Sequence, residues 1–135
     1  MGDTGQITDL VARTVEQFGG VDIVVNNAAN PLAQQVGSMT TEAMAKSWET
    51  NFRGPVWLVQ EALPHLRESG RGAIVNVTTA GVYTNGSYVS LYVAAKSAMA
   101  AMTRSMAAEL AGSGIRANAL APGTVATDMV FNTPE

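Results

Sequence analysis

Residues 21–29, VDIVVNNAA, begin with a run of mostly β-branched residues and end in two asparagines and two alanines. A continuous apolar run of this kind is typical of a strand that is buried on both faces of a parallel sheet, and the asparagines favour a turn directly after it. The same succession occurs twice more: GAIVNVT at 72–78 leads into TTAG at 78–81, and IRANALA at 115–121 leads into PGTVAT at 122–127. The chain is therefore predicted to contain three strands, each followed by a polar loop.

Helical patterns lie before and between these strands. Apolar residues recur at helical spacing over 7–18, and two glycines end that helix. A second helix is predicted over about 42–68, after a threonine cap and with disturbances at Pro55 and Pro64. A third covers 88–110 and is rich in alanine and methionine. Helices thus alternate with strands along the whole chain.

This alternation predicts right-handed βαβ crossovers and an α/β fold, a doubly wound parallel sheet in three α/β/α layers, as a single domain over 1–135. Ligands of such sheets bind at the carboxyl ends of the strands, where all three polar loops lie, so we expect the loops to form one site. A nucleotide-binding sheet of this type normally opens with a strand, a Gly-rich turn and a helix. This chain opens with a helix and contains no G-x-G-x-x-G, so we interpret it as the later half of an incomplete sheet.

The composition excludes several classes of function. The net charge is −3 and no basic run occurs, which argues against nucleic acid or an anionic membrane as a partner. There is no cysteine and only one histidine, so thiol chemistry is excluded and no metal site is expected. No apolar run is long enough to span a membrane and no signal peptide is recognisable. We therefore expect a cytoplasmic protein.

The helix over 88–110 carries an unusual pair, Tyr92 and Lys96. Residues four apart share one face of a helix, so the phenol and the ammonium group are predicted to project together. A cation near a phenol favours the phenolate and lowers its pKa, which suits a proton donor and acceptor. Ordinary core packing of the tyrosine with a solvent-seeking lysine is the alternative interpretation, and the pair alone does not decide between the two.

Asn51 lies four residues before Pro55 in the helix over 42–68. Proline has no N–H group, so the carbonyl of Asn51 lacks its helical hydrogen-bond donor. A buried carbonyl without a partner commonly binds water. The alternative is an asparagine in a helix that is kinked only for packing, and without other motifs that alternative is favoured.

Taken together, NNAA, NVTTAG, YVAAK and NALAPGTVAT, in this order and at this spacing, resemble the short-chain dehydrogenase/reductase family in its compact single-domain branch. The resemblance covers essentially the whole chain and implies a Rossmann fold. It also implies that a Gly-rich cofactor turn and three strands precede residue 1, and that a helix and a strand follow residue 135. We therefore expect the chain to be a fragment.

The resemblance implies a reversible hydride transfer between NAD or NADP and a small alcohol or carbonyl substrate. It assigns the acid/base to Tyr92, its partner to Lys96 and the start of a proton relay to Asn51. The family's catalytic serine falls at Thr79, a departure whose effect on activity is open, with Thr78 as the fallback. Cofactor contacts are implied for both members of the Tyr–Lys pair and for Asn26, Asn27, Ala28, Ala29, Pro122, Gly123 and Thr127, where Ala29 replaces the family's usual glycine.

Three other interpretations remain open: a truncated chain that cannot bind dinucleotide, the epimerase/dehydratase branch that shares Tyr-x-x-x-Lys, and a non-enzymatic binding module. The family also implies a homodimer or homotetramer, formed in a full-length parent through the two long helices. The sequence names neither the substrate nor the choice between NAD and NADP.

Overall fold

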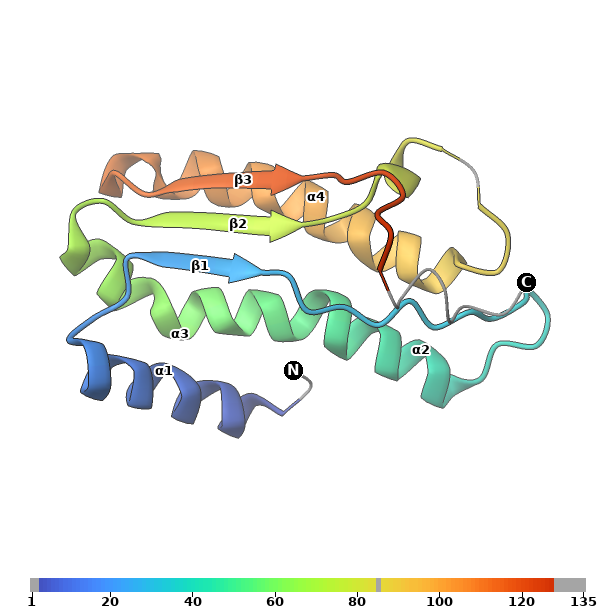
Figure 1. Cartoon of the computed structure of the whole chain (residues 1–135), viewed down its shortest axis with the longest axis horizontal. Coiled ribbons are helices and arrows are strands. Elements are labelled where there is room, and N and C mark those ends of the chain that lie inside the picture. Colours follow the sequence, from blue (N-terminus) through green and yellow to red (C-terminus); the bar gives the residue numbers. More distant parts are fainter. Residues whose placement is uncertain (1–2, 85, 128–135) are drawn as a thin grey trace.

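The computed structural model describes residues 3–84 and 86–127 and contains one parallel three-stranded sheet (Figure 1). The strands are β1 (Ile23–Asn26), β2 (Ala73–Val77) and β3 (Arg116–Leu120), in the spatial order β1-β2-β3. The three are in continuous register, because Val24 pairs with Ile74 and Ile74 with Ala117. The strands therefore end at one common edge, as the sequence predicts.

The helices begin and end at recognisable signals. In α1 (Thr4–Phe18), Asp3 accepts a hydrogen bond from the N–H of Gln6, and Gly19 ends the helix with φ 84°. The last long helix is α4 (Ser90–Leu110), which begins two residues later than predicted. Short 3-10 turns occupy Ala80–Val82 and Ala111–Ser113.

The predicted helix over 42–68 is divided into three parts in the structure. These are α2 (Thr41–Trp48), a π-helical turn (Glu49–Arg53) and α3 (Gly54–Ser69). The π turn immediately precedes Pro55, whose missing N–H removes an ordinary helical bond, whereas Pro64 lies inside α3 without interrupting it. The prediction that Pro55 disturbs the helix is thus confirmed, and the predicted disturbance at Pro64 is wrong.

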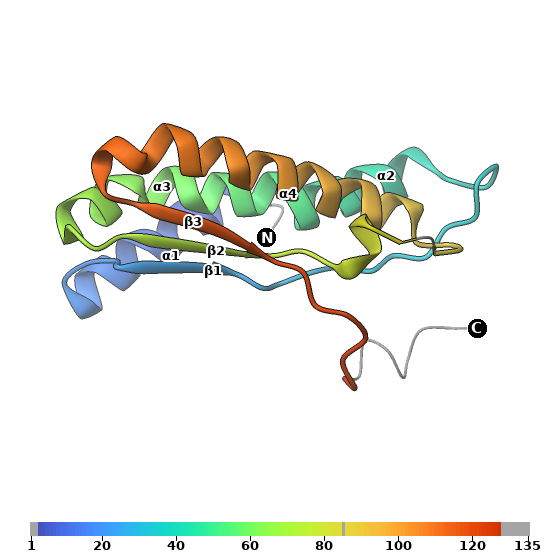
Figure 2. The same cartoon turned by 90° about the horizontal axis from the view of Figure 1, so that it is seen from above.

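The described chain contains two layers, the sheet and the helices on one of its faces, of a fold that the sequence predicts to be an incomplete part of a three-layer α/β/α sheet. Figure 2 shows α2, α3 and α4 on one side of the sheet, and α1 packs against α3 beside β1. On the covered face Val24 and Ile74 are 5% and 0% exposed, whereas Ile23 and Val25, which point to the other face, are 61% and 55% exposed. The expectation of strands buried on both faces is therefore corrected for these residues. The α/β class with a parallel sheet is confirmed.

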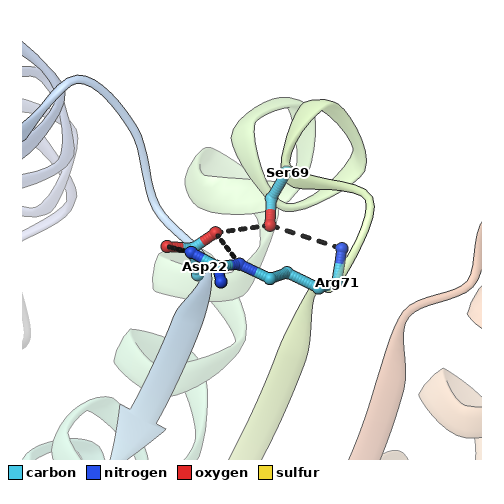
Figure 3. A network of polar contacts seen from close by, with 3 residues as sticks. All are labelled: Asp22, Ser69 and Arg71. Atoms are coloured by element: carbon cyan, nitrogen blue, oxygen red, sulfur yellow. Dashed lines mark hydrogen bonds and ion pairs between the residues drawn. The ribbon is translucent and has the colours of Figure 1, made fainter.

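The amino end of the sheet is held by charged and polar groups (Figure 3). Arg71 donates two hydrogen bonds to the carboxylate of Asp22, at 3.0 and 3.2 Å, and the hydroxyl of Ser69 donates a third at 2.6 Å. These bonds lower the pKa of Asp22, the one from Arg71 most strongly. The network joins the start of β1 to the turn between α3 and β2, at the end of the sheet opposite the polar loops.

Candidate active site

Backbone hydrogen bonds join the three loops that follow the strands. The N–H of Thr78 donates to the carbonyl of Leu120 at 2.7 Å, and that of Ala80 donates to Pro122 at 2.8 Å. The N–H of Gln34 donates to the carbonyl of Tyr88 at 2.7 Å. The loop after β2 is thus attached to the loops after both neighbouring strands, so the three loops form one continuous edge.

Thr79 and Tyr92 face each other across this edge. The hydroxyl oxygen of Thr79 accepts a hydrogen bond from the N–H of Gly81 at 3.2 Å, which leaves its proton free to donate. Gly81 lets the short turn approach α4 closely, because a Cβ there would lie 3.3 Å from a methyl group of Val93. The side chain of Thr79 also acts on Tyr92: burial raises the pKa of the phenol, and Thr79 offsets part of that rise. The pair is therefore positioned to share a proton.

Thr78, the fallback for the hydroxyl role, has a structural task. It is 3% exposed, and its hydroxyl donates to the carbonyl of Leu120 at 3.0 Å. The side chain therefore holds β3 against β2 and does not take part with Tyr92.

The pKa of Tyr92 differs from the sequence-based expectation. Burial is the largest influence and raises the pKa of the phenol above its ordinary value, and the bond from Thr79 offsets this in part. Lys96 lies 5.9 Å from the centre of the Tyr92 ring, but its ammonium group donates to the carbonyl of Val77 at 2.6 Å. The expected lowering by Lys96 is therefore not the dominant effect here, and the phenol is protonated at neutral pH.

Lys96 is itself buried, at 2% exposed, on the face of α4 that meets β2. Burial lowers the pKa of its ammonium group, because leaving water penalises the charged form. The bond to Val77 compensates in part, since hydrogen bonds from charged donors are the strong ones. Lys96 therefore places a positive charge at the carboxyl end of β2, beneath Tyr92.

Asn51 sits in the π turn with its side chain completely buried. Its amide oxygen accepts from the N–H of Asn30 and its amide nitrogen donates to the carbonyl of Asn30, both at 2.8 Å. The nitrogen also donates to the hydroxyl of Ser47 at 3.3 Å. The side chain thus fixes the loop after β1, and the π turn places it for that task.

The residues of the NNAA segment differ in burial, since the first lies in the core and the next two lie on the surface. Asn26 is 3% exposed, and its amide nitrogen donates to the Asn76 side chain at 2.8 Å and to the carbonyl of Pro55 at 3.3 Å. Asn76 in turn donates to the hydroxyl of Thr103 at 2.9 Å. Asn27 and Ala28 are exposed and Ala29 is half-buried. Asn26 is therefore placed to order the loop from within, and the residues after it line the surface.

The loop after β3 carries the remaining residues singled out from the sequence. Pro122 is half-buried, Gly123 is exposed, and the hydroxyl of Thr127 is exposed and donates to the carbonyl of Val125 at 3.4 Å. The backbone bond between Ala80 and Pro122 brings this loop beside the turn that carries Thr79. The structure thus places Pro122 beside the turn of Thr79, at the same edge of the sheet as the other two loops.

Sequence reasoning missed three contacts of this site. These are the clamp on Asn30, the bond from Lys96 to Val77 and the backbone bond between Gln34 and Tyr88. Each involves a main-chain N–H or carbonyl group, and all residue types except proline carry both of these groups. The positive φ of Tyr88 likewise has no sequence signal, because tyrosine is not a residue that favours it.

Other features of the described residues add no competing site. Hollows of 570 and 370 Å³ lie along α1 and between the end of α1 and α3, and none of the candidate active-site residues lines them. In the parts of the chain that the structure covers, no group of three or more His, Cys, Asp or Glu side chains is arranged to hold a metal ion. No described helix is both long and apolar enough to cross a membrane.

The sequence profile of the short chain dehydrogenase family matches residues 1–135. The chain therefore belongs to this family. A putative short-chain dehydrogenase/reductase from Burkholderia xenovorans has the same fold, with a TM-score of 0.91 and 32% identity over 97% of this chain and 52% of its own. A short-chain dehydrogenase from Streptomyces avermitilis superposes with a TM-score of 0.87 at 29% identity, over 95% of this chain and 47% of its own. The Rossmann-type fold is thus confirmed.

Curated relatives of the chain are oxidoreductases. It is 38% identical to the uncharacterized oxidoreductase YhdF of Bacillus subtilis, over 96% of this chain and 45% of that protein. It is 36% identical to 2-(R)-hydroxypropyl-CoM dehydrogenase of Xanthobacter autotrophicus, over 96% of this chain and 53% of that protein. The chain spans about half the length of these relatives, in agreement with the interpretation of the sequence as part of a larger sheet.

Proposed function

We propose that this chain forms the substrate end of an NAD(P)-dependent oxidoreductase that interconverts an alcohol and a carbonyl compound. The observation that carries the proposal is the arrangement of Thr79, Tyr92 and Lys96 at one sheet edge in a member of the short-chain dehydrogenase family. The relatives named above support oxidoreductase chemistry but differ in substrate, so none of their substrates is transferred to this chain.

The acid/base assignment follows from the protonation states. Because burial raises the pKa of Tyr92, the phenol carries its proton at neutral pH and donates it to the carbonyl oxygen during reduction. The Thr79 hydroxyl stabilises the negative charge that develops on the same oxygen. The buried positive charge of Lys96 then favours the phenolate that remains. In the reduction, the carbonyl π bond breaks as a C–H bond and an O–H bond form, and oxidation reverses these steps.

A nicotinamide cofactor supplies the hydride when it is bound. The residues present fit one end of such a group, because Asn27 and Ala28 are small and exposed after β1, and Thr127 presents an exposed hydroxyl after β3. We assign the adenosine side to 27–29 and the nicotinamide side to Pro122, Gly123 and Thr127. Both NAD and NADP are compatible with these residues, since none of them carries a charge.

We further propose that a full-length protein carrying this chain is a homodimer or homotetramer. The proposal is supported by Met44 and Trp48 on α2, which are 52% and 44% exposed and lie one helical turn apart. Large apolar side chains at such positions are suited to contact with a second copy.

The test uses Tyr92→Phe in a full-length protein that carries this chain, with Tyr83→Phe as the matched control because Tyr83 is 77% exposed. We expect Tyr92→Phe to lower kcat by at least about 100-fold, because it removes the acid/base, and to leave the Kd for NAD(P)H nearly unchanged. Thr79→Ser should retain activity, and Thr79→Val should lose it. The isolated 135-residue chain should show no turnover, because it contains no Gly-rich phosphate turn. A Tyr92→Phe enzyme with its full rate would refute the proposal.

A further inference from the structure

Tyr88 has a backbone conformation that tyrosine rarely adopts. Its φ is 66°, and it is the single positive-φ residue other than glycine in the described chain. The N–H of Gln34 donates to its carbonyl, so the conformation is fixed from the loop after β1. Tyr88 directly precedes Val89, the N-cap of α4, and Tyr92 follows in the first turn of that helix. The strained residue therefore stands at the entrance to the helix that carries the proposed acid.

The strain indicates that the ring itself has a task. Glycine and asparagine adopt this conformation at lower energy, so the backbone alone does not require an aromatic residue. Core packing does not require one either, because Tyr88 is 55% exposed. Residues held in unfavourable backbone conformations concentrate at functional sites. An exposed ring close to Tyr92 in sequence has one natural partner, which is the substrate.

The loops that follow the three strands carry no charged side chain. Residues 27–39, 78–89 and 120–127 contain no Asp, Glu, Lys, Arg or His, although 14% of the whole chain is charged. They present instead large side chains that are at least half exposed: Val36, Tyr83, Tyr88, Leu120 and Val125. The charged groups of the sheet lie at its opposite end, in the network of Asp22 and Arg71. These uncharged loops at the carboxyl edge of the sheet are thus suited to an uncharged apolar group.

We propose that Tyr88 is a specificity-determining residue and that its ring packs against an uncharged apolar group, aromatic or alkyl, beside the reacting carbonyl. This inference rests on the function proposed above and adds the class of substrate, a neutral ketone or secondary alcohol. The hydrogen bond between Gln34 and Tyr88 restrains the backbone of Tyr88, and with it the direction in which the side chain leaves the chain.

The test is steady-state kinetics of a full-length protein carrying this chain on matched pairs of ketones. Each pair shares one carbonyl environment and differs by a carboxylate, for example acetophenone and 4-acetylbenzoate, with aliphatic pairs beside them. Three variants separate the effect of the Tyr88 backbone conformation from the effect of its aromatic ring. Tyr88→Asn retains a residue that tolerates positive φ but removes the ring, and Tyr88→Phe removes only the hydroxyl. Phe18→Asn is the control, because Phe18 is an aromatic residue that is 73% exposed at the end of α1, away from these loops.

We expect the neutral member of each pair to be preferred in kcat/KM. Tyr88→Asn should raise KM for the neutral ketone by at least about tenfold with kcat nearly retained, since it removes binding and not chemistry. Tyr88→Phe and Phe18→Asn should change that KM by less than about twofold, and the Tm of all three variants should match that of the wild type. A preference for the carboxylated ketones, or an unchanged KM in Tyr88→Asn, would overturn the inference and leave the proposed function intact. Absence of any NAD(P)H-dependent reduction by the wild type would instead overturn the proposed function, and the inference with it.

Discussion

A buried lysine stays charged only if another group stabilises its ammonium group, and for Lys96 a main-chain carbonyl does so. Its side chain is 2% exposed, and its ammonium group donates to the carbonyl of Val77. Burial favours the neutral amine, and the pKa of the group is lowered accordingly. The positive charge that the proposed chemistry uses therefore weakens the folded state at neutral pH.

The cost of keeping Lys96 charged in the folded protein can be tested by comparing the pH dependence of the free energy of unfolding in the wild type and in Lys96→Met. Because the pKa of Lys96 is lower in the folded protein than its ordinary 10.5, the unfolded chain binds more protons in the window below that value. The free energy of unfolding of the wild type, minus that of the variant, should consequently increase as pH rises from about 7 towards about 10. Urea unfolding across this range measures it. A difference that does not change with pH would show that Lys96 does not titrate abnormally.

Among the elements, the turn between α3 and β2 is the tightest junction in the described chain. Gly72 is buried there, and a Cβ at this position would lie 2.7 Å from the carbonyl oxygen of Leu66 and 3.0 Å from the side chain of Ile115. The contact with Leu66 is to the backbone, which does not move aside as a flexible side chain does. The absence of a side chain at Gly72 therefore lets α3 and β3 both approach the start of β2.

Gly72→Ala should lower the free energy of unfolding by about 1–3 kcal/mol, the range found when a packed core is overfilled. Gly112→Ala is the matched control, because a Cβ at Gly112 meets nothing within 4 Å. It should change stability by at most about 1 kcal/mol, with a stabilising sign from the stiffer unfolded chain. Chemical denaturation of both variants gives the comparison. Equal effects of the two substitutions would mean that the junction has more room than its distances indicate.

The elements also show what the sequence predicts and what it does not. The β-branched run before Asn26 predicted β1, and the missing N–H of Pro55 predicted a disturbed helix, because both signals are local. The form of that disturbance, a π turn that aims Asn51 at Asn30, depends on a loop twenty-one residues away in sequence. Alternation of strands and helices does not give the spatial order of the strands, and with right-handed crossovers that order decides which face each helix covers. In the order β1-β2-β3 the crossover helices lie on one face, so the described residues contain one helical layer of the predicted three-layer fold.

On the scale of the whole molecule, the open face of the sheet is the most unusual surface. Ile23, Val25 and Leu120 are each more than half exposed on the strands, although apolar residues of a parallel sheet are normally covered. Figure 2 shows no described helix over this face. A sheet face of this kind favours contact with other apolar surfaces, so the isolated chain should associate with itself.

Val25→Lys tests this in two contexts. In the 135-residue chain, the substitution should lower the weight-average mass measured by sedimentation equilibrium, because it places a charge on the open face. In a full-length protein in which further helices cover that face, it should instead reduce stability by at least about 2 kcal/mol, since a valine contact is lost and a charge is buried. Val36→Lys is the control, the same change on a loop where the side chain is 77% exposed. A monomeric wild-type chain would contradict the first expectation, and an unaffected full-length protein would contradict the second.

The buried amides of Asn26 and Asn76 favour one register of β1 against β2 over the alternatives. The two residues are partners in the register of β1 and β2, and their side chains bond to each other on the covered face. If β1 slipped by one residue, Asn26 would turn to the opposite face, and the amide oxygen of Asn76 would be left in the core without the N–H group that donates to it. An orphaned buried amide costs about 1–3 kcal/mol, whereas the valines and isoleucine beside it would tolerate either alignment. The hydrogen-bonded amide pair thus raises the free energy of a slipped register relative to the native one, and so favours the strand alignment on which the site at the sheet edge depends.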